Sequence, residues 1–545
     1  MKIDVATADI TPLYLDSLGI IASLTKELKI SDRIDKKLYN NDKRRKITPG
    51  KAVEAMILNT LGFSERALYL TPHFYKNKPV SLLLGENIKN EDLNAYTLGH
   101  ALDEIAEYGC SKLFSELAFE IAIEKKLLNN INHVDTTTFS FHGNYNNNAE
   151  DTENTKDDTE PKKVHITYGY SKDKRPDLKQ ITLGMVMNSK INVPLWTESF
   201  DGNSSDKKTL QSTIEKVNKF TSALDLEKPF TWIADSALYN KNKLLKTNAF
   251  VWLTRIPHTL KESKDFLSKP YSSLKWTKAD CDYEYTEKKS NYGGIKQNWL
   301  MYYSKQKYKK DKAKFDKIYA KEKQILKSLE EKHKTKLYKT EKTCKKSQIK
   351  IEKEMKYHTI ESVIKKSKKD YKIEIKTKIK KESIRIKKAS LGRFILGTND
   401  KNEDHYKTSE ILKLYKSQQN IERGFRFLKD PYFMSDTFYL KKEERISSLL
   451  MIMTLTLFVY NYGQEKLNKN LKKTSNSLPN QKGKEKEKIT LKWAFKLMVG
   501  ISILQINNGL NVKSVKTKMS LVQEKIVKML CITENIYGVP VIDTS

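Results

Sequence analysis

The stretch from Ile411 to Asp430, ILKLYKSQQNIERGFRFLKD, decides how this chain is read, because its residues divide into two stripes at helical spacing. We expect one helix that ends before Pro431, since proline cannot continue a helix. One stripe is apolar and should pack, while the other places an acid among a phenol, an amide and two cations. Taken alone, an amphipathic helix with a solvated polar face explains the pattern equally well. The apolar stripe is Leu414, Ile421, Phe425 and Leu428, and the polar stripe is Tyr415, Gln418, Glu422, Arg426 and Lys429.

Two further acids favour a site over a solvated face. Asp135 in NHVDTTTFSFHG and Asp235 in FTWIADSALYN each lie in, or at the end of, a run of β-branched and aromatic residues that is typical of a strand. Carboxylates at strand ends and on a helix can converge at one end of a sheet. Such acids can bind two divalent ions about 4 Å apart, which activate a water or a 3′-hydroxyl and stabilise the leaving oxygen in phosphoryl transfer. Asp135, Asp235 and Glu422 are therefore the candidate catalytic residues and metal ligands.

These motifs and their order resemble those of bacterial insertion-sequence transposases of the DDE type, in the group with a Tyr-x2-Arg-x3-Glu-x6-Lys signature. In this chain the four positions are held by Tyr415, Gln418, Glu422 and Lys429, so glutamine replaces the arginine. The resemblance covers most of the chain from residue 131 to about residue 460. Its other pieces are HVDTTTF around Asp135, GYSKDKRPDLKQ over 169–180, DGNSSDKKTL over 201–210, IADSALY around Asp235, and FRFLKDP over 425–431.

The resemblance implies an α/β fold with a ribonuclease H-like catalytic core and a site that uses Mg²⁺, with Mn²⁺ as a possible substitute. It implies that Tyr415, Gln418 and Lys429 hold terminal DNA, with Lys429 on a phosphate. Arg423 or Arg426 would replace the missing arginine of the signature. The implied partners are double-stranded DNA, at the element's ends and at the target, and a second copy of the chain in the DNA complex. No nucleotide cofactor is expected, because one phosphodiester is exchanged for another.

The composition agrees with a polyanionic partner. The chain has 101 Lys and Arg against 67 Asp and Glu, a formal net charge of +34, which favours nucleic acid. A ribosome-like or architectural protein could carry the same charge. The four cysteines form no CxxC pair, so neither a zinc site nor a disulfide framework is indicated.

The N-terminus lacks the pattern of a secretory signal. The longest apolar run, Leu449 to Tyr460, is shorter than the roughly 18 residues that span a bilayer, so we expect a buried helix and no membrane. The expected location is the cytoplasm of a bacterium or archaeon, near its nucleoid.

The order of the predicted elements divides the chain. Strands at 179–188 and 191–200 should form an antiparallel meander with the strand of Asp135. A helix over 207–224 and strands at 230–235 and 249–256 should follow, which completes a ribonuclease H-like order. A helix from Lys442, with Arg445 near the site, should cover the sheet. The predicted domains are a helical, DNA-end-binding region at 1–130, the catalytic core at 131–257 and 391–468, a basic insertion at 258–390, and a C-terminal linker and helices at 469–545.

Three segments carry weaker predictions. The basic cluster Lys43 to Lys46 suits a phosphate contact, although a solvated charge cluster is the more common explanation. The Asn-rich stretch 144–163 is expected to be a loop. Inside the insertion, 308–356 is Lys-rich and near-helical while 371–379 alternates like a strand, which predicts a basic arm laid along DNA. The alternative is a charged helix that touches nothing.

Two other functions remain open from the residues. A metal-dependent nuclease on the same fold would use the same acids and differ only in lacking strand transfer. A DNA-binding protein that has lost catalysis, such as a decayed element, would keep the charge but not the reaction. The replacement of arginine by Gln418 keeps that second alternative open.

Overall fold

The computed structural model divides the chain into two compact units. Unit 1 comprises Met1–Trp232 and Ser417–Ser545, and unit 2 comprises Ile233–Lys416. We describe each unit by itself. The residues that the structure describes are 9–538, apart from 41, 43–44, 63–69, 143–144, 146–163, 225, 227–228, 240–249, 280–281, 352–354, 368–369, 401–405, 431–439, 441, 508–511, 531 and 533–535.

The N-terminal part of unit 1 is mainly helical, as predicted. Pro49 opens a helix at a position that needs no backbone N–H donor, Thr48 caps it by accepting a hydrogen bond from the Lys51 amide, and Gly62 follows its end. The last two helices of this region are separated at Gly109, which has a positive φ of 98°. The helices are α1 (Leu18–Glu27), α2 (Ile30–Leu38), α3 (Pro49–Leu61), α4 (Thr71–Tyr75), α5 (Val80–Leu84), α6 (Ala95–Tyr108) and α7 (Cys110–Glu124).

A sheet with antiparallel strands in the order β4-β3-β2 forms the centre of unit 1. The strands are β2 (Ile131–Phe141), β3 (Lys179–Asn188) and β4 (Val193–Asp201), which confirms the predicted meander. Helix α8 (Asp206–Thr221) and strand β5 (Thr231–Ala234) follow along the chain. Within unit 1, the Thr231 amide donates a hydrogen bond to the carbonyl of Asn130, just before β2, at 2.6 Å.

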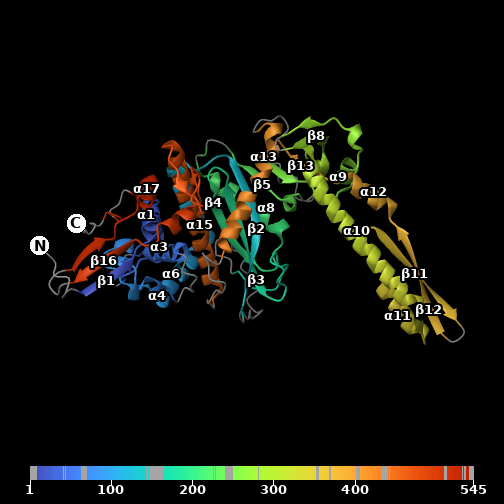
Figure 1. Cartoon of the computed structure of the whole chain (residues 1–545), viewed down its shortest axis with the longest axis horizontal. Coiled ribbons are helices and arrows are strands. Elements are labelled where there is room, and N and C mark those ends of the chain that lie inside the picture. Colours follow the sequence, from blue (N-terminus) through green and yellow to red (C-terminus); the bar gives the residue numbers. More distant parts are fainter. Residues whose placement is uncertain are drawn as a thin grey trace. The chain divides into compact units, whose positions relative to one another are not determined.

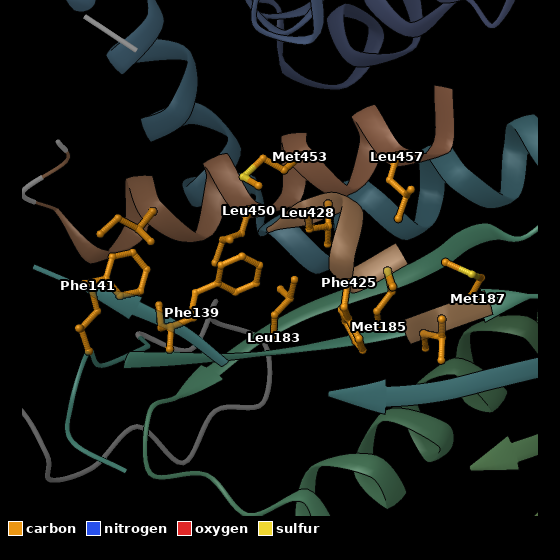
Figure 2. Close-up of a cluster of buried hydrophobic side chains, with 14 of the residues drawn as sticks. Phe139, Phe141, Leu183, Met185, Met187, Phe425, Leu428, Leu450, Met453 and Leu457 are labelled. Carbon is orange, nitrogen blue, oxygen red and sulfur yellow. The ribbon is translucent and has the colours of Figure 1, made fainter. Parts of the chain in front are cut away.

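Residues opposite each other on neighbouring strands share a face of the sheet. Asp135 lies opposite Met185 of β3, and His133 lies opposite Met187. Both methionines belong to the main apolar cluster (Figure 2). By their register, the side chains of His133 and Asp135 therefore stand on the face that this cluster covers. Helices α14 (Gln419–Leu428) and α15 (Glu443–Lys473) supply most of its other members. Its labelled members are Phe139, Phe141, Leu183, Met185, Met187, Phe425, Leu428, Leu450, Met453 and Leu457.

The single helix that we predicted over 411–430 is wrong in one respect, because the structure has two helices. Helix α13 (Ile411–Lys416) belongs to unit 2, and α14 belongs to unit 1. The amides of Asn420 and Ile421 bind the carbonyls of Ser417 and Gln418, three residues earlier, so the chain makes a tighter turn here than an α-helix does.

Helix α15 is the buried helix that the apolar run predicted. It is long and apolar enough to cross a membrane by length and composition, yet 72% of its most apolar window is buried inside the protein, as expected for a core helix. On the described residues, it covers the same face of the sheet as α14, since Thr454 approaches Thr197 of β4 at 3.3 Å.

Near the chain ends, unit 1 contains strands that the sequence did not reveal. Strand β1 (Asp9–Tyr14) pairs with β16 (Ser502–Asn507), which pairs with β17 (Val512–Lys516). The region from 491 to 530 was expected to be helical, but in its described part, which leaves out 508–511, only α16 (Leu491–Leu497) and α17 (Leu521–Met529) are helices.

Unit 2 contains a second group of strands, in the order β6-β13-β9-β8-β7. The strand predicted at 249–256 appears as β6 (Val251–Arg255), and β13 (Arg393–Thr398) lies where the catalytic core was expected to resume. Between them in sequence lie β7 (Thr277–Lys278), β8 (Tyr283–Ser290) and β9 (Gln297–Ser304), which we did not predict, and β13 pairs with both β6 and β9.

The basic arm of unit 2 follows β9. Its long helix α10 (Lys305–Lys334) runs beside the hairpin of β11 (His358–Ser367) and β12 (Asp370–Ile379), with α11 (Glu341–Ile351) and the short β10 (Leu337–Tyr338) against the hairpin (Figure 1). Helix α12 (Lys381–Ala389) leads back to β13. The expected basic helix and strand are thus both present, and a small core of Leu326, Tyr338, Cys344, Ile360 and Ile373 holds them together.

Candidate active site

The first acid, Asp135, lies within β2, a strand whose residues are mostly buried. It is half-buried, whereas His133, Thr136 and Thr137 beside it are buried. One carboxylate oxygen of Asp135 accepts a hydrogen bond from the Thr136 amide at 2.7 Å. This bond fixes the direction of the carboxylate relative to the strand.

The third acid, Glu422, is exposed on α14, whose other face is buried in the cluster of Figure 2. The helix lies close to the sheet because residue 424 is glycine: an added Cβ there would be 2.7 Å from the Met187 Cε atom. Immediately before α14, the Ser417 hydroxyl is 3.0 Å from His133 Nε2 on β2. Asp135 and α14 therefore lie on the same face of one sheet, although the two motifs are far apart in sequence.

The second acid, Asp235, belongs to unit 2 and directly follows β5. Its Oδ1 atom accepts a hydrogen bond from the Ala237 amide at 2.8 Å and so caps the short turn Ser236–Leu238. Its carbonyl oxygen accepts a hydrogen bond from the Thr254 hydroxyl of β6 at 2.5 Å. Asp235 is thus held at the end of a buried strand, which is where the sequence placed it.

The donor set of the three acids suits Mg²⁺, which prefers carboxylate oxygens. Within the described ranges, no three His, Cys, Asp or Glu side chains are close enough together to hold a metal ion by themselves. Mg²⁺ is commonly held by only one or two carboxylates together with substrate phosphates and waters, so a closed protein cage is not required.

The predicted DNA-binding residues differ in exposure. Arg423 and Arg426 are exposed on α14, and Lys429 at its end is half-buried. Tyr415 is half-buried and lies in unit 2. Gln418 is only 8% exposed, and its buried Oε1 has no hydrogen-bond partner in the described part of the chain.

Sequence reasoning missed a group of side chains on the other side of β2. The Lys172 ammonium is 2.7 Å from both the carbonyl and the hydroxyl of Thr136, and 3.1 Å from an Asp206 carboxylate oxygen. The Thr136 hydroxyl also donates to Asp206 at 2.5 Å. Asp173, next to Lys172, binds Lys429. The motifs that carry Lys172, Asp173 and Asp206 were noted in the sequence, but nothing in it assigned their partners.

Arg45, from the cluster that we associated with a phosphate, and Arg445, which we expected near the site, are both bound to acids of the helical region. Arg45 of the basic cluster makes two hydrogen bonds to Glu104, at 2.5 and 2.9 Å. Arg445 donates two hydrogen bonds to the Asp103 carboxylate of α6, at 2.7 and 2.6 Å. These bonds lower the pKa of the Asp103 carboxyl. Of the remaining predictions, Lys43 and Arg44, the residue Pro431, and nearly all of the loop 144–163 fall outside the described residues.

Comparisons with known proteins add two similarities. Residues 10–119 match a family described as a domain of unknown function, DUF4277, and this match ends before all three acids. No curated protein matches the chain. Among solved structures, the chain is similar to piggyBac transposase in a cryo-EM structure of its synaptic complex with hairpin DNA, with 9% identity and a TM-score of 0.37 over 98% of this chain and 89% of that one.

Proposed function

We propose that this protein is a Mg²⁺-dependent transposase that binds the terminal inverted repeats of its own element, cleaves DNA at those ends and joins the 3′-hydroxyls to target DNA. Asp135, Asp235 and Glu422 would hold the metal ions, and Lys429 would bind a DNA phosphate. Bound Mg²⁺ supplies charge that stabilises the attacking and leaving oxygens of phosphoryl transfer. Two copies of the chain act together, because two DNA ends must be brought into one complex.

One observation carries this proposal. The hydrogen bond of 3.0 Å between Ser417 and His133 connects the start of α14 to β2, two residues before Asp135. It supports a shared site for the first and third acids, since Asp135 stands on the covered face and Glu422 remains exposed on the covering helix.

The charge distribution supports DNA as the partner. Helix α10 has twelve lysines against five acids in its sequence, and most of those lysines are exposed. Lysine contacts to phosphates give affinity without sequence information and make binding strongly dependent on salt. The arm therefore suits DNA backbone, whereas the end sequence must be read elsewhere.

The test is a strand-transfer assay with a duplex that carries the element's own end, Mg²⁺ and a target plasmid. We expect the intact protein to join the end to the plasmid, and Asp135→Ala and Asp235→Ala to lose both cleavage and joining while they still bind the duplex. Glu107→Ala, which removes an exposed acid of α6, is the matched control and should remain active. Cleavage without joining would identify a nuclease instead.

The buried Gln418 favours a second candidate function, a DNA-binding protein that has lost catalysis. Its side chain is only 8% exposed, so it offers little surface for a contact with DNA. The test applies if the intact protein binds the end but does not cut it. If the replacement of arginine by Gln418 caused the loss of activity, Gln418→Arg should restore cleavage. No recovery would leave DNA binding as the function.

A further inference from the structure

The loop between β2 and β3 has a fixed base. The Thr167 and Gln180 backbones form a bridge there, and the Gln180 side chain donates to the Gly202 carbonyl at 2.7 Å. Gly169 leaves no room for a side chain, because an added Cβ would be 2.0 Å from the Gly202 carbonyl oxygen. The residues that follow Gly169 are therefore held close to the sheet by the backbone itself.

Lys172 attaches this loop to β2. Its backbone amide donates to the Thr138 hydroxyl at 3.2 Å, and its ammonium donates to the carbonyl and hydroxyl of Thr136 at 2.7 Å each. The same ammonium is 3.1 Å from Asp206 at the start of α8. Thr136 in turn donates its amide to Asp135. Lys172 is thus one residue removed from the first acid.

Asp173 attaches the same loop to α14. Its two carboxylate oxygens accept hydrogen bonds from the Lys429 ammonium at 2.8 and 2.7 Å. Lys429 follows the last residue of α14, the helix that carries Glu422, and its ammonium lies 5.5 Å from the centre of the Phe139 ring. An ammonium has three donors, so Lys429 keeps one for a phosphate while it binds Asp173.

These two adjacent residues contact opposite faces of the sheet. Side chains alternate along a strand, so Thr136 and Thr138 lie on one face of β2 and Asp135 and Phe139 on the other. Thr136 contacts α8, whereas Phe139 belongs to the apolar cluster with Phe425 of α14. The loop therefore connects α8, β2 and α14 through side chains that are next to each other in the sequence.

We propose that Lys172 and Asp173 form a positioning clamp that fixes β2, with Asp135, relative to α14, with Glu422. The inference rests on the proposed function and adds two residues that act through others. Metal-dependent phosphoryl transfer needs its carboxylates held to within about 0.5 Å. The Lys429 and Asp173 side chains are 26% and 41% exposed, and exposed ion pairs contribute little to stability. The contribution of the clamp is therefore to geometry, and its loss should affect the reaction more than the folding.

The experiment compares Asp173→Asn and Lys172→Gln with Asp177→Asn in the full-length chain. Asp177 is an exposed acid of the same loop that binds only Arg175 among the contacts described, so its variant removes equal charge without touching the clamp. Under single-turnover conditions with saturating protein, we expect the clamp variants to cleave the end duplex about tenfold more slowly, because small misplacements of reacting groups are costly. Duplex affinity and the melting temperature should stay close to those of the intact chain, and Asp173→Glu should recover part of the rate.

A second readout needs no activity. Hydrogen exchange without DNA should be faster in peptides of α14 for Asp173→Asn, but unchanged for Asp177→Asn. Equal hydrogen exchange and equal cleavage rates in Asp173→Asn and Asp177→Asn would overturn the clamp. A loss of duplex affinity large enough to explain the whole loss of cleavage rate would also overturn it. If the intact chain does not cut DNA at all, the proposed function fails, while hydrogen exchange still decides whether Asp173 holds α14.

Discussion

Helices α15 and α10 have nearly the same length, 31 and 30 residues, but opposite relations to solvent. Sixteen residues of α15 are buried, and only four of α10 are. Helix α15 stabilises the sheet that carries Asp135, whereas α10 extends an arm of lysines with a narrow apolar stripe. The difference separates two requirements of the proposed function: rigid placement of Asp135 and Glu422 in unit 1, and a charged surface for DNA backbone in unit 2.

The largest effect should follow from a cavity in the core of unit 1. Phe425→Ala removes a ring that is 7% exposed and packs beside Met185 and Met187, which should cost about 3–5 kcal/mol. The equivalent change in the arm is Phe315→Ala, where the ring is 5% exposed but belongs to a small cluster with Tyr357 and Leu391. We expect thermal unfolding to show a lower transition for unit 1 in the first variant only. If the folded fractions of both variants lost cleavage to the same extent, the distinction between the core of unit 1 and the arm of unit 2 would be wrong.

A smaller effect concerns pH and the charge around the arm. Burial, together with nearby Arg255 and Lys387, lowers the pKa of His258 from 6.5 to about 4. Below pH 6.5 the His258 imidazole of the unfolded chain therefore binds a proton more readily than that of the folded chain. The free energy of unfolding falls as the pH is lowered from 6.5 towards 4, by at most about 3 kcal/mol. Urea unfolding of His258→Gln should depend less on pH in this window than unfolding of the intact chain. His100→Gln, at a largely exposed histidine, is the control, and an equal slope in all three proteins would refute the assignment.

The smallest effect per residue should come from the lysines of α10. Replacement of Lys309, Lys312 and Lys317 by Gln should weaken duplex binding and reduce the slope of log affinity against log salt by about 0.9 for each phosphate contact that is lost. The cleavage rate at saturating protein should not change. Three exposed lysines outside the arm, Lys207, Lys208 and Lys219 on α8, provide the matched control. An unchanged salt slope in the α10 variant would mean that the arm touches no DNA.

Elements with strong periodicity were predictable from the sequence. The apolar run predicted α15, and the strand-like runs predicted β2, β3 and β4. Runs of β-branched and aromatic residues also indicated that Asp135 and Asp235 lie in or after strands.

Features that depend on distant partners were not predictable. Strand β1 pairs with β16, which comes from the other end of the chain, and β9 pairs with β13, which follows the whole arm in sequence. The contacts of Lys172 and Asp173 depend on residues of β2, α8 and α14 that no spacing in the sequence relates to them. The turn at Ser417 is likewise set by His133, a residue of the sheet.

The central claim is that an acid on α14 completes a metal-dependent DNA-cutting site, and one measurement tests it most directly. Cleavage of a duplex with the element's own end is followed with and without Mg²⁺, for the intact chain and for Glu422→Gln. We predict Mg²⁺-dependent cuts at the end by the intact chain, and loss of cutting without loss of duplex binding in the variant. Cleavage by Glu422→Gln at the rate of the intact chain would contradict the account.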